Sequence, residues 1–195
     1  MSEGESVRVF CAVELPREVR EAAAAHAARL RRFTGVRASW ARPEGLHITL
    51  KFIGEVNAAR VESISTAAGA AAGGFRPFRL SIEEAGTFPP RGAARVLWLG
   101  VRDDSGQLSR LQQRLEEVCS AAGFVRESKP FKPHLTLARL RSLQASDLPA
   151  FLSDEHRRAS FGPFQFEVTQ IVVMRSELGP GGSRYTPLSR HTFGG

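Results

Sequence analysis

The sequence predicts an α+β fold in which mixed or antiparallel sheets are covered on the outside by helices. Two observations carry this prediction. Segments with apolar–polar alternation outnumber segments with helical periodicity, so the chain holds more strands than a β–α–β alternation would contain. In addition, one succession of elements occurs once in each half of the 195 residues: a strand, a helix, and then a strand that carries His-x-Thr-Leu. A duplicated lobe would produce such a repeat.

The first half is expected to contain two strands and two helices. Residues 7–15 alternate apolar and polar side chains as a strand does, and Pro16 opens a helix with an apolar stripe. Residues 46–53 alternate again. Asn57 can cap a second helix, which Gly73-Gly74 ends. The stripes of the two helices are Val19, Ala23, His26, Leu30 and Phe33, and then Val61, Ile64, Ala68 and Ala71.

The second half is expected to follow the same pattern. A helix begins at Ser105, ends at Gly123 and carries an apolar face at helical spacing. A short helix is predicted around residues 148–152, and a turn at residues 179–182. The predicted strands are residues 78–82, 95–101, 134–140, 164–174 and a segment near 185–188.

The length of 195 residues fits one compact domain, residues 1–195, or two small lobes fused without a linker. Hydrophobic residues make up 42% and charged residues 24% of the chain, which is enough apolar material for a core. The net charge of +7 favours an anionic partner such as RNA, DNA or a phosphorylated small molecule, although a plain solvated basic surface gives the same charge. Cys11 and Cys119 are too few for a disulfide framework and are interpreted as packing residues. The polar, acidic N-terminus and the lack of a long apolar run predict a soluble cytoplasmic protein.

The two His-x-Thr-Leu strands present their polar residues on one face. Residues i and i+2 of a strand share a face, so His47, Thr49 and Lys51 lie opposite Leu46, Ile48, Leu50 and Phe52, which are expected to face the core. In the second copy, His134 and Thr136 lie outward while Leu135 and Leu137 lie inward. One such tetrapeptide is a weak signal, but two on predicted strands in separate halves are a strong one.

Paired histidines suit cleavage of a phosphodiester without metal. An imidazole with an ordinary pKa of about 6.5 exchanges a proton readily at neutral pH. Two of them on opposite sides of a phosphate allow one to deprotonate water while the other protonates the leaving oxygen. The hydroxyls of Thr49 and Thr136 can donate to non-bridging phosphate oxygens and stabilise the developing charge.

From Val7 to its C-terminus the chain resembles the bacterial and archaeal RNA 2′,3′-cyclic phosphodiesterases, historically called 2′-5′ RNA ligases, of the 2H phosphoesterase superfamily. Both histidine motifs match the family pattern without departure. The matching segments are FCAVELP at 10–16, LHITLKFIG at 46–54, RVLWLG at 95–100, KPHLTLAR at 132–139, and Arg175-Ser176 followed by Gly182 and Tyr185.

The resemblance implies a bilobal, pseudo-twofold fold of two interwoven lobes, in which two mostly antiparallel sheets face a central cleft and each lobe brings one motif. It also implies that His47 is the proton donor to the leaving 3′ oxygen, that His134 is the proton acceptor, and that the product is a 2′-phosphate. It places Arg139 on the phosphate. Strict alternation instead puts Arg139 on the face of Leu135, so a bulge near Ala138 would be needed to re-aim it.

Two further residues are candidates for substrate binding from their strand faces. Phe10 falls on the polar face of its strand and could stack on a nucleobase, or pack as a structural phenylalanine. Lys51 shares the predicted face of His47 and could attract RNA phosphates, or be solvated. Of the other histidines, His26 is interpreted as a packing residue on its helix, and His156, beside two arginines, as a surface residue.

The sequence predicts no metal and no cofactor, because it lacks a cysteine cluster, His-Glu-x-x-His and the phosphate-binding glycine loop. The expected partner is RNA or an oligonucleotide with a 2′,3′-cyclic phosphate end. The protein is expected to be a monomer that binds no membrane and has no obligate protein partner. Two alternatives stay open: 2′-5′ ligation of cyclic-phosphate and 5′-hydroxyl ends, and a non-catalytic nucleotide- or RNA-binding module.

Overall fold

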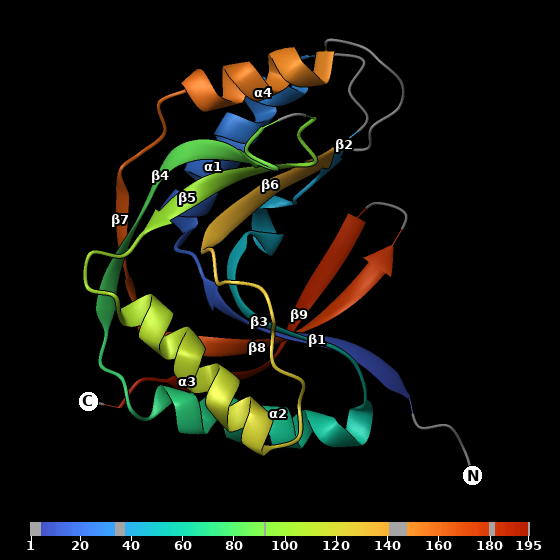
Figure 1. The fold of residues 1–195 in the computed structure, drawn as a ribbon, viewed down its shortest axis with the longest axis vertical. Helices are drawn as coiled ribbons and strands as arrows, with labels where there is room; N and C mark the ends of the chain where they lie inside the picture. The colour runs from blue at the N-terminus through green and yellow to red at the C-terminus, as the bar shows by residue number, and fades with distance from the viewer. Residues whose placement is uncertain (1–4, 34–37, 92, 141–147, 180–181, 195) are drawn as a thin grey trace.

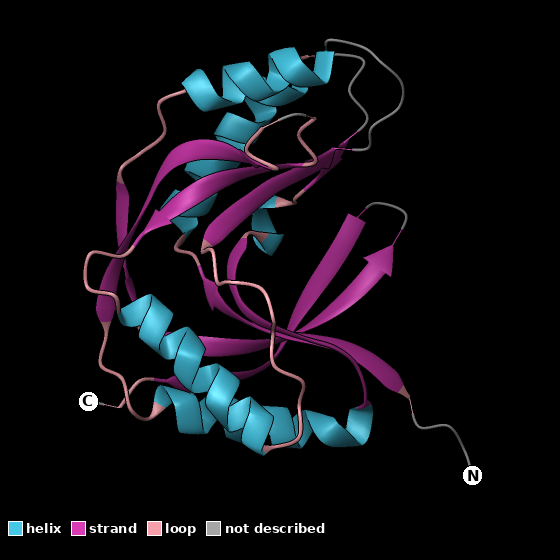
Figure 2. Ribbon diagram, in the orientation of Figure 1, coloured by secondary structure: helices cyan, strands magenta, loops and turns pink. Residues whose placement is uncertain are grey.

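The computed structural model describes residues 5–33, 38–91, 93–140, 148–179 and 182–194, in which nine strands form one curled sheet (Figures 1 and 2). The main path of the sheet is β7-β4-β5-β6-β3-β1-β8-β9, with β2 paired to β6, and every described strand pair is antiparallel. The predicted α+β class is confirmed. The strands are β1 (Ser6–Glu14), β2 (Ala38–Trp40), β3 (His47–Asn57), β4 (Phe78–Phe88), β5 (Val96–Arg102), β6 (His134–Leu140), β7 (Phe164–Val168), β8 (Gln170–Gly179) and β9 (Gly182–Thr192).

The two expected sheets are two halves of this one sheet, joined where β3 meets β6. That junction consists of one residue pair, Ile48 with Leu135. One half holds β3, β1, β8 and β9, and helices α2 (Val61–Ala72) and α3 (Gln107–Ala121) pack on it (Figure 1). The other half holds β7, β4, β5, β6 and β2, and carries α1 (Arg17–Arg31) and α4 (Leu148–Arg158).

The chain crosses between the halves several times. Helix α1 follows β1 but packs against β6 and α4, and α3 follows β5 but packs against β3 and α2. The predicted strand 164–174 is divided at Thr169, because β7 pairs with β4 in one half while β8 pairs with β1 in the other. Each half is therefore completed by chain segments that begin in the other.

The helix boundaries follow local hydrogen bonding. The side chain of Asn57 accepts from the backbone N–H of Ala59 at 2.9 Å, so it caps a 3₁₀ turn, Ala58–Arg60, that leads into α2. Helix α3 begins at Gln107 rather than Ser105, since the carboxylate of Asp103 accepts from the N–H of Leu108 at 2.8 Å. The predicted turn at 179–182 includes residues 180–181, which lie outside the described residues. Strand β2 went unpredicted because three residues are too short to show a period.

The apolar residues form a main core between the sheet and the helices and a second, smaller cluster on the opposite face of β1 and β8. The small cluster consists of Phe10, Ala12, Val172 and Met174, with Tyr185 packed against it. No helix among the described residues is long and apolar enough to span a membrane.

A buried pair of histidines joins α1 to α4, which corrects the interpretation of His156 as a surface residue. Arg29 donates to Nδ1 of His26 at 3.1 Å, so His26 donates from Nε2 to Nδ1 of His156 at 3.0 Å. His156 in turn donates from Nε2 to the carbonyl oxygen of Trp98 at 2.9 Å. Both rings are neutral in this chain of hydrogen bonds, because an added proton would place two donors face to face. Burial, above all, lowers the pKa of His26 from 6.5 to about 4.

We expect this pair to make the fold sensitive to acid. Between pH 6.5 and about 4 the unfolded chain binds a proton at His26 that the folded chain does not, so the free energy of unfolding falls as the pH falls through that window. His26→Gln keeps a donor toward His156 but does not titrate. Urea unfolding at several pH values should show a shallower pH dependence for this variant, by up to roughly 1.4 kcal/mol per pH unit. An unchanged slope would contradict the assignment.

Candidate active site

The Ile48–Leu135 pair brings the two histidine motifs together on one face of the sheet. Both residues are fully buried, so their neighbours along each strand point to the opposite face. Antiparallel register about this pair sets His47 beside Thr136 and Thr49 beside His134. All four polar residues line a single pocket. Its other lining residues are Ser39, Trp40, Ala41, Arg42, Gly45, Phe52, Arg139, Ser183 and Tyr185.

Each motif strand contains a β-bulge at the leucine of His-x-Thr-Leu. On β3 the register passes from Thr49 to Lys51 against consecutive residues of β1, which leaves Leu50 as the extra residue. On β6 it passes from Thr136 to Ala138 against consecutive residues of β5, which leaves Leu137 as the extra residue. Beyond a bulge the alternation of faces reverses.

The reversal aims Arg139 and Phe52 at the pocket. The bulge that Arg139 requires is present, one residue before Ala138, and its side chain lines the pocket. Phe52 occupies the equivalent position after the first bulge. Its side chain was expected in the core but is 53% exposed and lines the same pocket.

The same reversal turns Lys51 inward and shows that its predicted contact with RNA phosphates is wrong. Lys51 is 2% exposed. Its ammonium group donates to the carboxylate of Glu116 at 2.7 Å and to the carbonyl oxygen of Val125 at 2.8 Å. Its charge is therefore neutralised inside the protein and does not reach the pocket.

Phe10 does not offer a free face for a nucleobase, because its ring is 2% exposed. It lies at 4.7 Å from the ring of His47 and at 5.2 Å from that of Tyr185, measured between centroids. Of the two interpretations of Phe10, the structure supports the packing one. The Phe10 ring packs directly against the ring of His47.

Both motif histidines are anchored in the same way. Nδ1 of His47 donates to the carbonyl oxygen of Gly45 at 2.7 Å, and Nδ1 of His134 donates to that of Lys132 at 2.6 Å. A carbonyl only accepts, so the proton of each neutral ring sits on Nδ1 and Nε2 is the nitrogen left for chemistry. Nε2 of His47 lies 3.1 Å from the hydroxyl of Thr49.

Aromatic edges complete the orientation of the two rings. Tyr185 meets His47 at a centroid distance of 4.9 Å and an interplanar angle of 86°. Phe88 meets His134 at 5.0 Å and 87°. A Cβ at Gly45 would lie 3.1 Å from the Tyr185 ring, so a side chain there would require this ring to shift by a few tenths of an ångström.

The electrostatics of the pocket lower the pKa of both histidines. Burial is the main cause in each case, and the backbone hydrogen bond to Nδ1 opposes it. The charge of His134 further lowers the pKa of His47, and the charge of Arg139 further lowers the pKa of His134. The two histidines are thus electrostatically coupled. Among the described residues, no group of three or more His, Cys, Asp or Glu side chains is placed to hold a metal ion.

Several pocket residues were not singled out from the sequence. Trp40 ends the three-residue strand β2, Arg42 lies in a loop, and Ser183 lies near the start of β9; the pattern of these segments shows no chemistry. Tyr185 belonged to the C-terminal segment that carries the family resemblance, but nothing in β9 alone indicated that it would touch His47. Only the packing of the β8–β9 hairpin beside β1 shows this.

The fold and the pair of motifs define a class, the 2′-5′ RNA ligase superfamily. The model of that family matches residues 19–180, and the chain belongs to it. Within the family, the chain is similar to proteins named RNA 2′,3′-cyclic phosphodiesterase. The one from Archaeoglobus fulgidus is 35% identical over 184 residues, covering 93% of this chain and 98% of the relative. The one from Escherichia coli K12 is 30% identical over 187 residues, covering 95% and 96%.

Solved structures agree with this placement. The chain is similar to TT0787 of Thermus thermophilus, with a TM-score of 0.79 and 30% identity over 95% of this chain and 97% of that one. It is also similar to Escherichia coli LigT complexed with 3′-AMP, with a TM-score of 0.75 and 30% identity over 97% and 99%. The similarity extends over nearly the whole of each chain.

The coupling between the histidines predicts the outcome of a titration. Replacement of His134 by glutamine removes a positive charge near His47, so the pKa of His47 should rise while burial still holds it below 6.5. NMR titration of the ring signals measures this shift. His191→Gln, a substitution outside the pocket, serves as the control and should leave the pKa of His47 unchanged. No shift in His134→Gln would show that the two rings are not coupled.

Proposed function

We propose that this protein hydrolyses 2′,3′-cyclic phosphate ends of RNA to 2′-phosphomonoesters by two-histidine acid–base catalysis without a metal. One observation carries the proposal: histidines from two distant motifs line one pocket, and each is held by Nδ1 with Nε2 left for proton transfer. The names of its relatives, RNA 2′,3′-cyclic phosphodiesterases, support the substrate class.

In this mechanism Nε2 of neutral His134 takes a proton from water as its oxygen attacks phosphorus. The bond from phosphorus to the 3′ oxygen breaks, and Nε2 of protonated His47 supplies the proton to that leaving oxygen. The product keeps the phosphate on the 2′ oxygen. One proton is taken up and one is delivered in each turnover, so a proton exchange with solvent resets the pair.

The assignment of acid and base follows the family resemblance, because burial first and a neighbouring positive charge second lower the pKa of both histidines. Arg139 acts on His134 and lowers its pKa, which favours the neutral ring that a proton acceptor needs. A bound phosphate anion would favour the protonated form of His47 against the burial that lowers its pKa. The hydroxyls of Thr49 and Thr136 and the guanidinium of Arg139 line the pocket where they can stabilise the charge on the non-bridging oxygens.

We also propose that residues 1–195 act as one domain of two interwoven lobes and as a cytoplasmic monomer. A single chain contributes both motifs and the other pocket residues, so no second subunit is needed to complete the site. The cysteines at positions 11 and 119 are buried as free thiols, which suits a reducing compartment.

Substitution of either motif histidine tests the function. His47→Gln and His134→Gln should each lower kcat for a 2′,3′-cyclic-phosphate-ended oligonucleotide by roughly 10²–10⁴-fold. The double variant should lose little more, because the two groups act in one step. Chelator should leave the wild-type rate unchanged, and the product should be the 2′-phosphate.

His191→Gln is the matched control and should retain activity. Circular dichroism checks that each variant folds. Undiminished turnover in either motif variant would eliminate the mechanism. An added 5′-hydroxyl oligonucleotide in the same assay measures how much joined product forms instead of hydrolysed product.

The exposed ring of Phe52 predicts that substrates with a nucleobase are turned over with a higher kcat/KM than substrates without one. Its ring is exposed in the pocket and can stack on a nucleobase, an interaction worth roughly 1–3 kcal/mol per base. Phe52→Ala should therefore lower kcat/KM for a cyclic nucleotide by roughly 5–150-fold, but not for the cyclic phosphate of a ribose that lacks a base. Phe151→Ala, which removes another exposed phenylalanine, is the control. Equal losses on both substrates would show that Phe52 does not bind the base.

A further inference from the structure

The segment that delivers His134 to the pocket contains no regular secondary structure. Residues 124–133 connect the end of α3 to β6, with no helix or strand between Gly123 and His134. The segment ends where β6 begins, and there β6 pairs with the other motif strand, β3, through a single residue pair, Leu135 with Ile48. The sheet therefore joins the two motif strands directly at one residue pair, while β6 is held on its other side by β5, where His134 pairs with Gly100.

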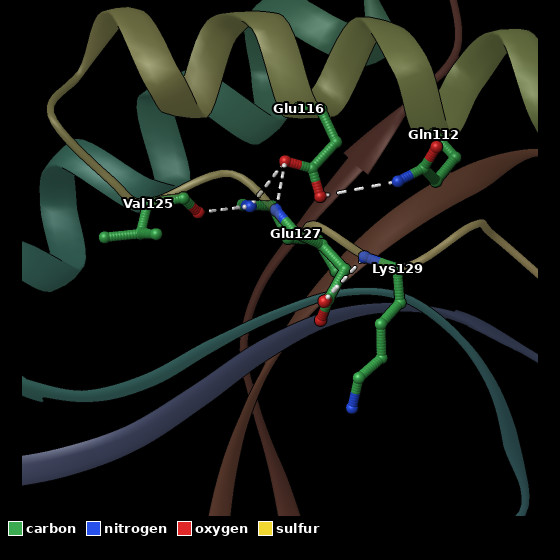
Figure 3. Close-up of polar contacts among 6 residues, drawn as sticks. Gln112, Glu116, Val125, Glu127 and Lys129 are labelled. Carbon is green, nitrogen blue, oxygen red and sulfur yellow. Dashed lines mark hydrogen bonds and ion pairs between the residues drawn. The ribbon is translucent and has the colours of Figure 1, made fainter.

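A buried ion pair supplies a further restraint on this segment. The Lys51 ammonium group donates both to Glu116 of α3 and to the carbonyl oxygen of Val125 in the segment. The Glu116 carboxylate also accepts from the N–H of Glu127 at 3.3 Å and from Gln112 at 3.4 Å. Figure 3 shows Glu116 between Gln112 and the backbone at Val125 and Glu127. Two backbone groups of the segment are thus held by one ion pair.

The position of Lys51 in the sequence links this restraint to the first motif. Lys51 follows Thr49 and the bulge at Leu50 on β3, the strand that begins with His47. The bulge turns its side chain to the face opposite the pocket, toward α3. Lys51 therefore belongs to the strand of the first motif and donates a hydrogen bond to the segment that leads to the second motif.

The burial of this pair indicates a role beyond stability. The Lys51 side chain is 1% exposed and that of Glu116 is 8% exposed. Removal of two charges from water is costly, and apolar residues of similar size often replace such a pair without loss of stability. A buried pair that holds two backbone groups instead determines which conformation those groups adopt.

We infer that Lys51 and Glu116 are positioning residues, whose ion pair sets the placement of His134 relative to His47. This inference rests on the proposed function, since it concerns the geometry of the same acid–base pair. It assigns the lysine next to the first motif a role on the hidden side of the strand. Neither residue touches the substrate.

The double variant Lys51→Met/Glu116→Met tests this role, because it leaves no unpaired buried charge and is expected to fold. We expect kcat to fall by roughly 10–100-fold with KM within about threefold of the wild type, since a small displacement of a catalytic group costs rate more than binding. The pKa of His134, followed by NMR, should rise toward 6.5 as water reaches its ring, while that of His47 moves less.

The matched control is the double variant Arg114→Met/Glu117→Met, which removes an exposed ion pair from the same helix. It should leave kcat and the pKa of His134 unchanged. If Lys51→Met/Glu116→Met fails to fold, Glu116→Gln replaces it, with an expected three- to tenfold loss of kcat and the same direction of pKa change. A wild-type kcat and a wild-type His134 pKa in the variant tested overturn the inference.

The outcomes also separate this inference from the proposed function. An inactive wild-type protein would refute the proposed function, whereas the NMR titration reports on the placement of His134 without any turnover. Active wild type with unaffected positioning variants would refute the inference alone. A loss of kcat without a change in the His134 pKa would also count against the inference, because a general destabilisation of the fold explains that result.

Discussion

The site depends on one backbone contact, the antiparallel pairing of Ile48 with Leu135. This pair joins the two halves of the sheet and buries both aliphatic side chains in the core. Because faces alternate along a strand, the same pair turns His47, Thr49, His134 and Thr136 to the opposite face, in one pocket. A register shift of one residue would send a histidine into the core and a leucine into the pocket. Core packing and active-site geometry are therefore set by the same pairing.

The two bulges make an asymmetric site from a duplicated motif. Each occurs at the leucine of His-x-Thr-Leu and reverses the faces of the residues that follow. In one half the reversal brings Phe52 to the pocket and Lys51 to the interior. In the other it brings Arg139 to the pocket and Ala138 to the interior. The first motif strand therefore contributes the aromatic ring of Phe52 to the pocket, and the second contributes the positive charge of Arg139.

Two sets of buried polar groups hold together segments from different parts of the chain. His26 and His156 join α1 to α4 through neutral rings whose donors and acceptors all match. Lys51 and Glu116 join β3 and α3 to the segment before His134. In both places backbone carbonyls serve as the final acceptors, so the groups are satisfied despite burial. These contacts define the relative positions of elements that apolar packing alone would leave less specific.

The sequence by itself determined the type of the longer elements, the α+β class, the duplicated motif and the common face of its histidines and threonines, because these follow from side-chain periods within single strands and helices. Only the tertiary structure decided which of Lys51, Phe52 and Phe10 are buried and which line the pocket. A bulge is a mismatch between two strands, so the extra residues Leu50 and Leu137 are defined by partners on β1 and β5 rather than by their own sequence. The contact of Tyr185 with His47 likewise joins segments far apart in the chain. Periodicity describes one strand, whereas the pocket is a property of several strands in register.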